Sequence, residues 1–189
     1  MPSRPEQRAQ ALQLVLASAS PQRRAILAEA GFAFAVRPAD VAEETDGDPA
    51  EVAELNARRK ALAVPGEAVL GADTIVVLDG AILGKPRDAA QAREYVGRLN
   101  GRTHEVVGGI ALARGGEIVA TAVETTRVTF HELDDAPLDA YVATGEWEGR
   151  AGGYAIQGHG ASLVDRIEGD YLNVVGLALG RVKALLATC

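Results

Sequence analysis

An aspartate and a lysine stand twelve residues apart in the segment GADTIVVLDGAILGKP, residues 71–86. Asp73 interrupts an apolar run, where a carboxylate is costly unless it is hydrogen-bonded or holds a metal ion. We expect Asp73 to end a strand, either as a metal ligand or base, or as a cap of the turn with Thr74. Lys85 is part of a Gly-Lys-Pro turn. Together, Asp73 and Lys85 indicate a site for a metal ion and a phosphate.

Lys85 is not the lysine of a P-loop. A P-loop needs four residues between its two glycines and a serine or threonine after the lysine. In this chain three residues separate Gly80 from Gly84, and Pro86 follows the lysine. Lys85 could still bind a phosphate as a point charge.

The segment SASPQRRAIL, residues 18–27, is a second candidate phosphate site. Ser20 suits the N-cap of a helix, and Pro21 suits its first position. The start of this helix would offer free N–H groups and a positive dipole end to an anion. Arg23 and Arg24 lie in the first turn, where the dipole disfavours cations. A bound anion would explain them, and the alternative is a pair of solvated surface arginines.

The sequence indicates a few other polar residues as site residues, but less strongly. Glu43 and Glu44 belong to an acidic stretch, and one of them could reach a metal ion beside Asp73. Lys60 lies near the end of a predicted helix, where a cation is favoured anyway. Gln157, in the glycine-rich GGYAIQGHG, offers an amide that matches the N3–H and carbonyl of uracil or thymine. It could equally be an incidental residue of a tight turn.

The elements that must position these groups mix strands joined by hairpins with strands joined by helices. This order favours an α/β fold with a mixed sheet. Asp79-Gly80 is typical of a hairpin turn. The predicted strands cover residues 12–18, 32–37, 68–73, 74–78, 103–113, 117–133 and 162–170. The predicted helices cover residues 21–30, 49–63, 88–101, 136–146 and roughly 175–186, and residues 1–11 are predicted to be a mobile lead-in.

Composition narrows the class of protein. The 189 residues are the size of one domain, and 48% of them are hydrophobic. The net charge of −7 argues against a nucleic-acid polymer or a membrane as partner, because both reward a basic surface. Cys189 is the one cysteine, and the three histidines have no metal-ligand spacing. The polar N-terminus has no signal-peptide core, so we expect a cytoplasmic location.

Taken in order, the segments resemble the Maf family of nucleoside triphosphate pyrophosphatases. The resemblance spans nearly the whole chain after residue 13, and the ordered set is highly specific. The matching segments are SASPQRR (18–24), VAEE (41–44), ARRKALAV (57–64), GADTIVVLDGAILGKP (71–86), LNGRTHEV (99–106), GGYAIQGHGASLV (152–164) and GDYLNVVGL (169–177).

The resemblance implies a single Maf-like domain over residues 1–189. Its fold would be α/β, with a mixed β-sheet flanked by helices and two lobes around a central cleft, related to the inosine triphosphate pyrophosphatase architecture. The implied reaction converts a nucleoside triphosphate and water into a nucleoside monophosphate and pyrophosphate, with Mg²⁺ or another divalent cation such as Mn²⁺. It also implies a homodimer, a link to cell-division arrest, and closer similarity to the dTTP/UTP branch of the family.

Residue by residue, the resemblance implies that Asp73 is the proton acceptor that activates water. Glu43 would hold the metal ion with Asp73, and Glu44 could assist or replace it. Lys60 and Lys85 would bind phosphate. Ser18, Ser20 and Arg23 are implied to bind substrate, and Gln22, Thr74 and Gln157 are implied to choose the base. Asp73 and Lys85 should then face one triphosphate from opposite sides, with Mg²⁺ beside the aspartate.

Two other functions stay open. One is a non-catalytic regulator of septation that binds nucleotides or a division partner, and the other is a phosphatase that releases inorganic phosphate. The presence of Asp73, Glu43, Lys60 and Lys85 together favours the pyrophosphatase, because a regulator would not need a water-activating carboxylate.

Overall fold

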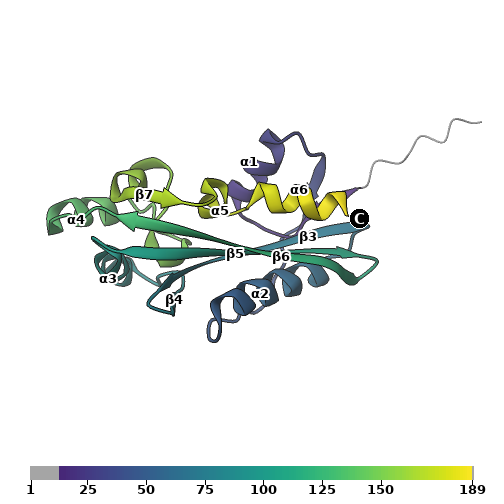
Figure 1. Ribbon diagram of the computed structural model, residues 1–189, viewed down its shortest axis with the longest axis horizontal. Helices are drawn as coiled ribbons and strands as arrows, with labels where there is room; N and C mark the ends of the chain where they lie inside the picture. Colours follow the sequence, from purple (N-terminus) through teal and green to yellow (C-terminus); the bar gives the residue numbers. More distant parts are fainter. Residues whose placement is uncertain (1–12, 189) are drawn as a thin grey trace, which may run out of the picture.

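The computed structural model describes residues 13–188, so the predicted lead-in lies outside the described residues. Seven strands form one sheet, with helices on both faces (Figure 1). The strands are β1 (Leu14–Leu16), β2 (Phe34–Val36), β3 (Ala68–Leu78), β4 (Ala81–Leu83), β5 (Thr103–Arg114), β6 (Glu117–Phe130) and β7 (Val164–Glu168). The helices are α1 (Pro21–Glu29), α2 (Pro49–Ala63), α3 (Ala89–Leu99), α4 (Asp135–Ala143), α5 (Tyr171–Val175) and α6 (Leu179–Ala187), with the 3-10 turns η1 (Ala151–Gly153) and η2 (Gly158–Leu163).

The sheet is mixed, as predicted. Its strand order is β2-β1-β3-β5-β6-β7, with β4 beside β3. Strand β1 is parallel to both β2 and β3, and the other pairs are antiparallel. The hairpin predicted at Asp79-Gly80 is confirmed. It joins β3 to β4, and both turn residues have positive φ, 51° and 78°.

One edge of β3 is only partly covered by other strands. Strand β5 pairs with residues 68–77 along one edge. On the opposite edge, β1 pairs with residues 68–70 and β4 with residues 76–78. Residues 71–75 therefore have no strand beside them on that edge within the described chain. The middle of β3 opens into this gap.

Asp73 lies in that uncovered middle, and the prediction that it ends a strand is wrong. Residues 68–78 form one continuous strand, with Asp73 at its sixth position. A buried strand tolerates this carboxylate because partners from another element satisfy its oxygens. Since side chains alternate along a strand, Asp73 faces α2 and Thr74 faces the opposite side of the sheet.

Helix α2 packs on one face of the sheet, and α1, α5 and α6 lie on the other (Figure 1). Two glycines let α2 approach closely. A Cβ atom at Gly71 would lie 2.1 Å from the carbonyl oxygen of Ala57, and one at Gly109 would lie 2.1 Å from that of Ala53. This close approach brings the polar residues of α2 to Asp73. None of the helices within residues 13–188 is long and apolar enough to cross a membrane.

The hydrophobic core has two main parts, which agree with the predicted two lobes. In the first lobe, β1 and the adjoining part of β3 and β5 pack against α1 and α6. In the second lobe, the other ends of β3, β5 and β6 pack with β4, α3, α4 and the 3-10 turns. Representative buried residues are Leu16, Leu27, Leu70 and Val182 in the first lobe, and Val96, Leu99, Phe130 and Leu163 in the second.

The predicted final helix over residues 175–186 is wrong at its start. The structure has two helices there, α5 and α6, separated by residues 176–178. Gly176 has a φ of 140°, which glycine adopts more readily than any other residue. The helical periodicity of the sequence continues across this point, so it did not reveal the break. The turn places the Gly176 carbonyl oxygen over the cleft side of the sheet, where α1 and β3 contact it.

His104 is buried in the second lobe, and it supplies a prediction on pH. Its ring lies at right angles to Phe130 and hydrogen-bonds to the Tyr154 hydroxyl at 2.8 Å. Burial lowers the pKa of His104 to about 4 from an ordinary 6.5. The unfolded chain thus binds the proton more tightly, so the folded state loses stability as the pH falls from 6.5 towards 4.

We therefore expect His104→Gln to flatten the pH dependence of stability. Glutamine can still hydrogen-bond to Tyr154 but does not titrate. Between pH 7 and pH 5 the wild type should lose about 2 kcal/mol of unfolding free energy that the variant does not lose. Urea unfolding of both proteins at the two pH values measures the difference. Equal losses in the two proteins would contradict a buried neutral imidazole.

Candidate active site

A cleft of about 510 Å³ opens between the lobes at the uncovered part of β3. Its walls include residues 17–23 of the first lobe and residues 148–151 of the second. Nine of the ten predicted site residues line it: Ser18, Ser20, Gln22, Arg23, Glu43, Lys60, Asp73, Thr74 and Lys85. Gln157 is exposed and does not belong to the lining.

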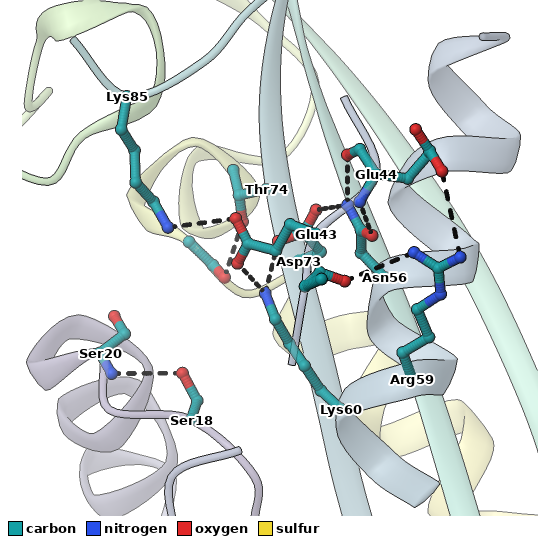
Figure 2. Close-up of polar contacts among 12 residues, drawn as sticks. Ser18, Ser20, Glu43, Glu44, Asn56, Arg59, Lys60, Asp73, Thr74 and Lys85 are labelled. Atoms are coloured by element: carbon teal, nitrogen blue, oxygen red, sulfur yellow. Dashed lines mark hydrogen bonds and ion pairs between the residues drawn. The ribbon is translucent and has the colours of Figure 1, made fainter. Parts of the chain in front are cut away.

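Two carboxylates and two ammonium groups form a chain across this cleft (Figure 2). The Lys60 ammonium lies 2.7 Å from Asp73 Oδ1 and 2.7 Å from Glu43 Oε1. The Lys85 ammonium lies 3.3 Å from Glu43 Oε2. The order Lys85–Glu43–Lys60–Asp73 runs from the exposed second-lobe turn to the buried strand. Asp73 and Lys60 are only 5% and 8% exposed, so removing either would leave the other as a buried charge with one partner fewer.

The neighbouring Lys60 and Lys85 ammonium groups lower the pKa of Glu43. Burial alone would raise the pKa of Glu43, but the hydrogen bonds and charges of Lys60 and Lys85 outweigh burial and lower it. Glu43 therefore stays a carboxylate in acid conditions where an ordinary glutamate begins to take up a proton.

Glu43 and Glu44 point their carboxylates in different directions. Glu44 points its carboxylate towards Arg59, 4.0 Å away, and away from the cleft (Figure 2). Its backbone instead binds Asn56: the Glu44 N–H donates to Asn56 Oδ1 at 2.7 Å, and Asn56 Nδ2 donates to the Glu44 carbonyl at 2.9 Å. Of the two acids, Glu43 is the one that pairs with Lys60 and Lys85 in the cleft.

Asn56 is a site residue that the sequence pattern did not predict. It is 1% exposed, and its Nδ2 also donates to Asp73 Oδ2 at 3.0 Å. Asn56 thus holds the second oxygen of Asp73 while Lys60 holds the first. Its sequence position could have indicated this role: asparagine is a poor helix former, and it lies inside a helix, four residues before Lys60 and on the same face.

Arg23 is not a solvated surface residue, whereas Arg24 is exposed. The Arg23 guanidinium donates to the Gly176 carbonyl at 2.9 Å, to Ser18 Oγ at 3.1 Å and to Thr74 Oγ1 at 3.1 Å. Burial lowers the pKa of Arg23, and the nearby negative charges of Asp73 and Glu43 oppose this change. Since a guanidinium has five N–H donors, two are left for a phosphate.

A model of the family described as Maf-like protein matches residues 13–189. The chain belongs to this family. A relative from Anaeromyxobacter dehalogenans, named dTTP/UTP pyrophosphatase, is 49% identical over 178 residues, which cover 92% of each chain. A relative from Symbiobacterium thermophilum with the same name is 49% identical over 180 residues, again 92% of each chain. The predicted resemblance to the family and to its dTTP/UTP branch is confirmed.

A solved structure of a HAM1 protein from Coxiella burnetii has the same fold as this Maf-like protein. The TM-score is 0.53 at 17% sequence identity, and the match covers 95% of this chain and 100% of that one. At this identity the likeness shows the fold alone. It agrees with the predicted mixed α/β architecture.

The start of α1 in this Maf-like protein follows the sequence prediction. Ser20 is the N-cap, with its hydroxyl accepting from the Arg23 N–H at 3.4 Å, and Pro21 is the first helical residue. The Ser20 N–H in turn donates to Ser18 Oγ at 3.2 Å. Both serines line the cleft, so the positive end of the α1 dipole faces the space where an anion would bind.

We expect Asn56→Ala to destabilise the protein by about 2–3 kcal/mol, because it leaves the buried Asp73 carboxylate and the part-buried backbone of Glu44 without their hydrogen bonds. Arg59→Ala is the matched control. Arg59 contacts the same loop from the same helix, at the Ala42 carbonyl and the Glu44 carboxylate, but it is exposed. The control should lose no more than about 1 kcal/mol. Urea unfolding compares the two, and similar losses would contradict the role of Asn56.

Proposed function

We propose that this Maf-like chain is an enzyme that hydrolyses dTTP or UTP to the nucleoside monophosphate and pyrophosphate. The observation that carries the proposal is the buried Asp73, held by Lys60 and Asn56 at the floor of a cleft of about 510 Å³. A cleft of this size suits a small-molecule ligand. The two relatives at 49% identity, both named dTTP/UTP pyrophosphatase, support the choice of substrate.

Asp73 is the proposed proton acceptor. Its two oxygens each accept one hydrogen bond from the protein, one from Lys60 and one from Asn56. A carboxylate oxygen has two lone pairs, so each oxygen can still accept a hydrogen bond from a water molecule. As that water attacks the α-phosphorus, Asp73 takes its proton, the bond to the β-phosphate oxygen breaks, and pyrophosphate leaves. Lys60 and Asn56 keep the carboxylate in one orientation during this step.

The residues fit a divalent cation, Mg²⁺ or Mn²⁺. Asp73 and Glu43 already share one cation, the Lys60 ammonium, and no group of three or more acidic, histidine or cysteine ligands occurs within residues 13–188. Mg²⁺ is commonly bound by one or two carboxylates together with substrate phosphates, so two carboxylates suffice. We propose Glu43 and Asp73 as its protein ligands. When bound, the cation neutralises charge on the phosphates.

The remaining polar groups of the cleft would bind and select the nucleotide. Lys85 and the two unused N–H donors of Arg23 are proposed to bind phosphates, with Ser18 and Ser20 at the start of α1. Gln22 and Thr74 line the cleft and are the proposed base-selecting residues. The part of Gln157 in base choice, the homodimer, the cytoplasmic location and the link to cell division stay predictions.

The experiment that tests this function resolves products. Purified protein is incubated with Mg²⁺ or Mn²⁺ and dTTP, UTP, CTP or GTP, and the monophosphate, diphosphate, pyrophosphate and phosphate are separated. We expect monophosphate and pyrophosphate, with dTTP and UTP turned over fastest. Diphosphate and phosphate would instead identify a phosphatase. Nucleotide binding without turnover under either metal would favour the non-catalytic regulator.

A further inference from the structure

We propose that Arg150 binds the terminal phosphates of the substrate and the departing pyrophosphate. This inference rests on the proposed function, because it names a further contact in the same site. Arg150 lines the cleft from the second lobe. Its Nε is buried and has no hydrogen-bond partner within residues 13–188. Because this N–H is shielded from solvent, a phosphate in the cleft would instead bind the four N–H donors of the terminal amino groups of the same guanidinium.

The other cations of the cleft already have acceptors in the protein. Arg23 donates to three oxygens, and the Lys60 ammonium lies between two carboxylates. Lys85 has one carboxylate, at 3.3 Å, and its side chain is 55% exposed. Arg150 differs because its Nε has no hydrogen-bond partner in the described chain and its charge acts on Glu146 only through space, adding to the backbone hydrogen bonds that lower the pKa of that carboxyl. Among the four described cations that line the cleft, Arg150 therefore has the most N–H donors available to an anion.

The backbone around Arg150 holds it beside the turn that carries Lys85. The Arg150 N–H donates to the Trp147 carbonyl at 3.0 Å, and the Gly152 N–H donates to the Gly84 carbonyl at 3.0 Å. Gly84 directly precedes Lys85. A Cβ atom at Gly152 would lie only 2.8 Å from a methyl group of Val76, so this loop also packs tightly on β3. The second lobe therefore presents two cations from adjoining segments.

The position of these cations relative to Asp73 points to the terminal phosphates. Asp73 must lie beside the water that attacks the α-phosphorus. From there the charge chain leads through Lys60 and Glu43 to Lys85, at the second lobe. The β- and γ-phosphates would follow the same direction and reach Lys85 and Arg150. Pyrophosphate gains negative charge as it leaves, and a guanidinium can bind its oxygens in pairs.

The test compares wild type with Arg150→Gln. Calorimetry gives the Kd for pyrophosphate in Mg²⁺ buffer and the Kd for dTMP, and turnover kinetics give the KM for dTTP. We expect the Kd for pyrophosphate and the KM for dTTP to rise roughly 10- to 100-fold. The Kd for dTMP should change less than about twofold, because its single phosphate occupies the α position. Arg150→Lys should recover part of the loss, since it restores the charge without the paired donors.

Two controls separate this role from a structural one. Arg87→Ala removes the same charge from an exposed arginine outside the cleft, and it should leave all three ligands unaffected. Because Arg150 makes no hydrogen bond through its buried Nε, Arg150→Gln should melt no lower than wild type. A clear fall in melting temperature, or equal losses for dTMP and pyrophosphate, would overturn the inference.

The outcomes also distinguish this inference from the proposed function. If wild type forms monophosphate and pyrophosphate while Arg150→Gln binds pyrophosphate normally, the inference fails and the function stands. If wild type turns over no nucleotide, the proposed function fails, and the pyrophosphate measurement still shows whether Arg150 binds that anion.

Discussion

Replacing Asp73 with asparagine is expected to lower kcat for the formation of monophosphate and pyrophosphate by roughly 10²- to 10⁴-fold. Asparagine has nearly the same size and can keep a hydrogen bond to Asn56 or Lys60, but it does not take a proton from water. Lys60 retains Glu43 as a charged partner at 2.7 Å, so the variant should fold. The effect should therefore appear in kcat rather than as a loss of folded protein.

Asp79→Asn is the matched control for this variant. Asp79 follows the same strand, but it is exposed and pairs with Arg102 at 2.7 Å outside the cleft. For both variants we would measure product formation from dTTP and the melting temperature. The two measurements separate a loss of catalysis from a loss of folded protein. A folded Asp73→Asn protein that keeps more than a tenth of the wild-type kcat would show that another group accepts the proton.

The second large effect is expected for Lys60→Met, which should destabilise the protein by about 3 kcal/mol. Methionine fills the space of the lysine stem but leaves Asp73 buried without its counter-ion. Removing one partner of a buried ion pair costs more than the pair itself contributes, because the charge that is left lacks compensation. For a chain of this size the loss corresponds to a fall in melting temperature of about 6–12 °C.

Three further measurements identify the cause of that loss. The double variant Lys60→Met/Asp73→Asn should recover most of the stability, because it leaves no buried unpaired charge. Mg²⁺ should stabilise Lys60→Met more than wild type, since a cation between Asp73 and Glu43 would replace the missing ammonium. Lys183→Met, at an exposed position of α6, should have little effect. A double variant no more stable than Lys60→Met would disprove the charge explanation.

The local sequence was enough to predict those features that depend on neighbouring residues. Ser20-Pro21 determined the start of α1, because a serine cap and a proline satisfy the first turn of a helix by themselves. Asp79-Gly80 determined the hairpin between β3 and β4, because its two positive φ values need such residues. The costly carboxylate of Asp73 in an apolar run marked the site before any partner was known.

The tertiary structure alone decided which groups meet. Asn56 and Asp73 are 17 positions apart, and Arg23 and Gly176 are 153 apart, so no local pattern links them. The same holds for the different contacts of the Glu43 and Glu44 carboxylates and for Asp73 in mid-strand rather than at a strand end. The contacts of Asp73 depend on where α2 packs on the sheet and on the part of β3 that β1 and β4 leave uncovered. The sequence shows where a charged residue would be buried at a cost in free energy. Only the packing of distant segments determines which residues neutralise that charge or hydrogen-bond to it.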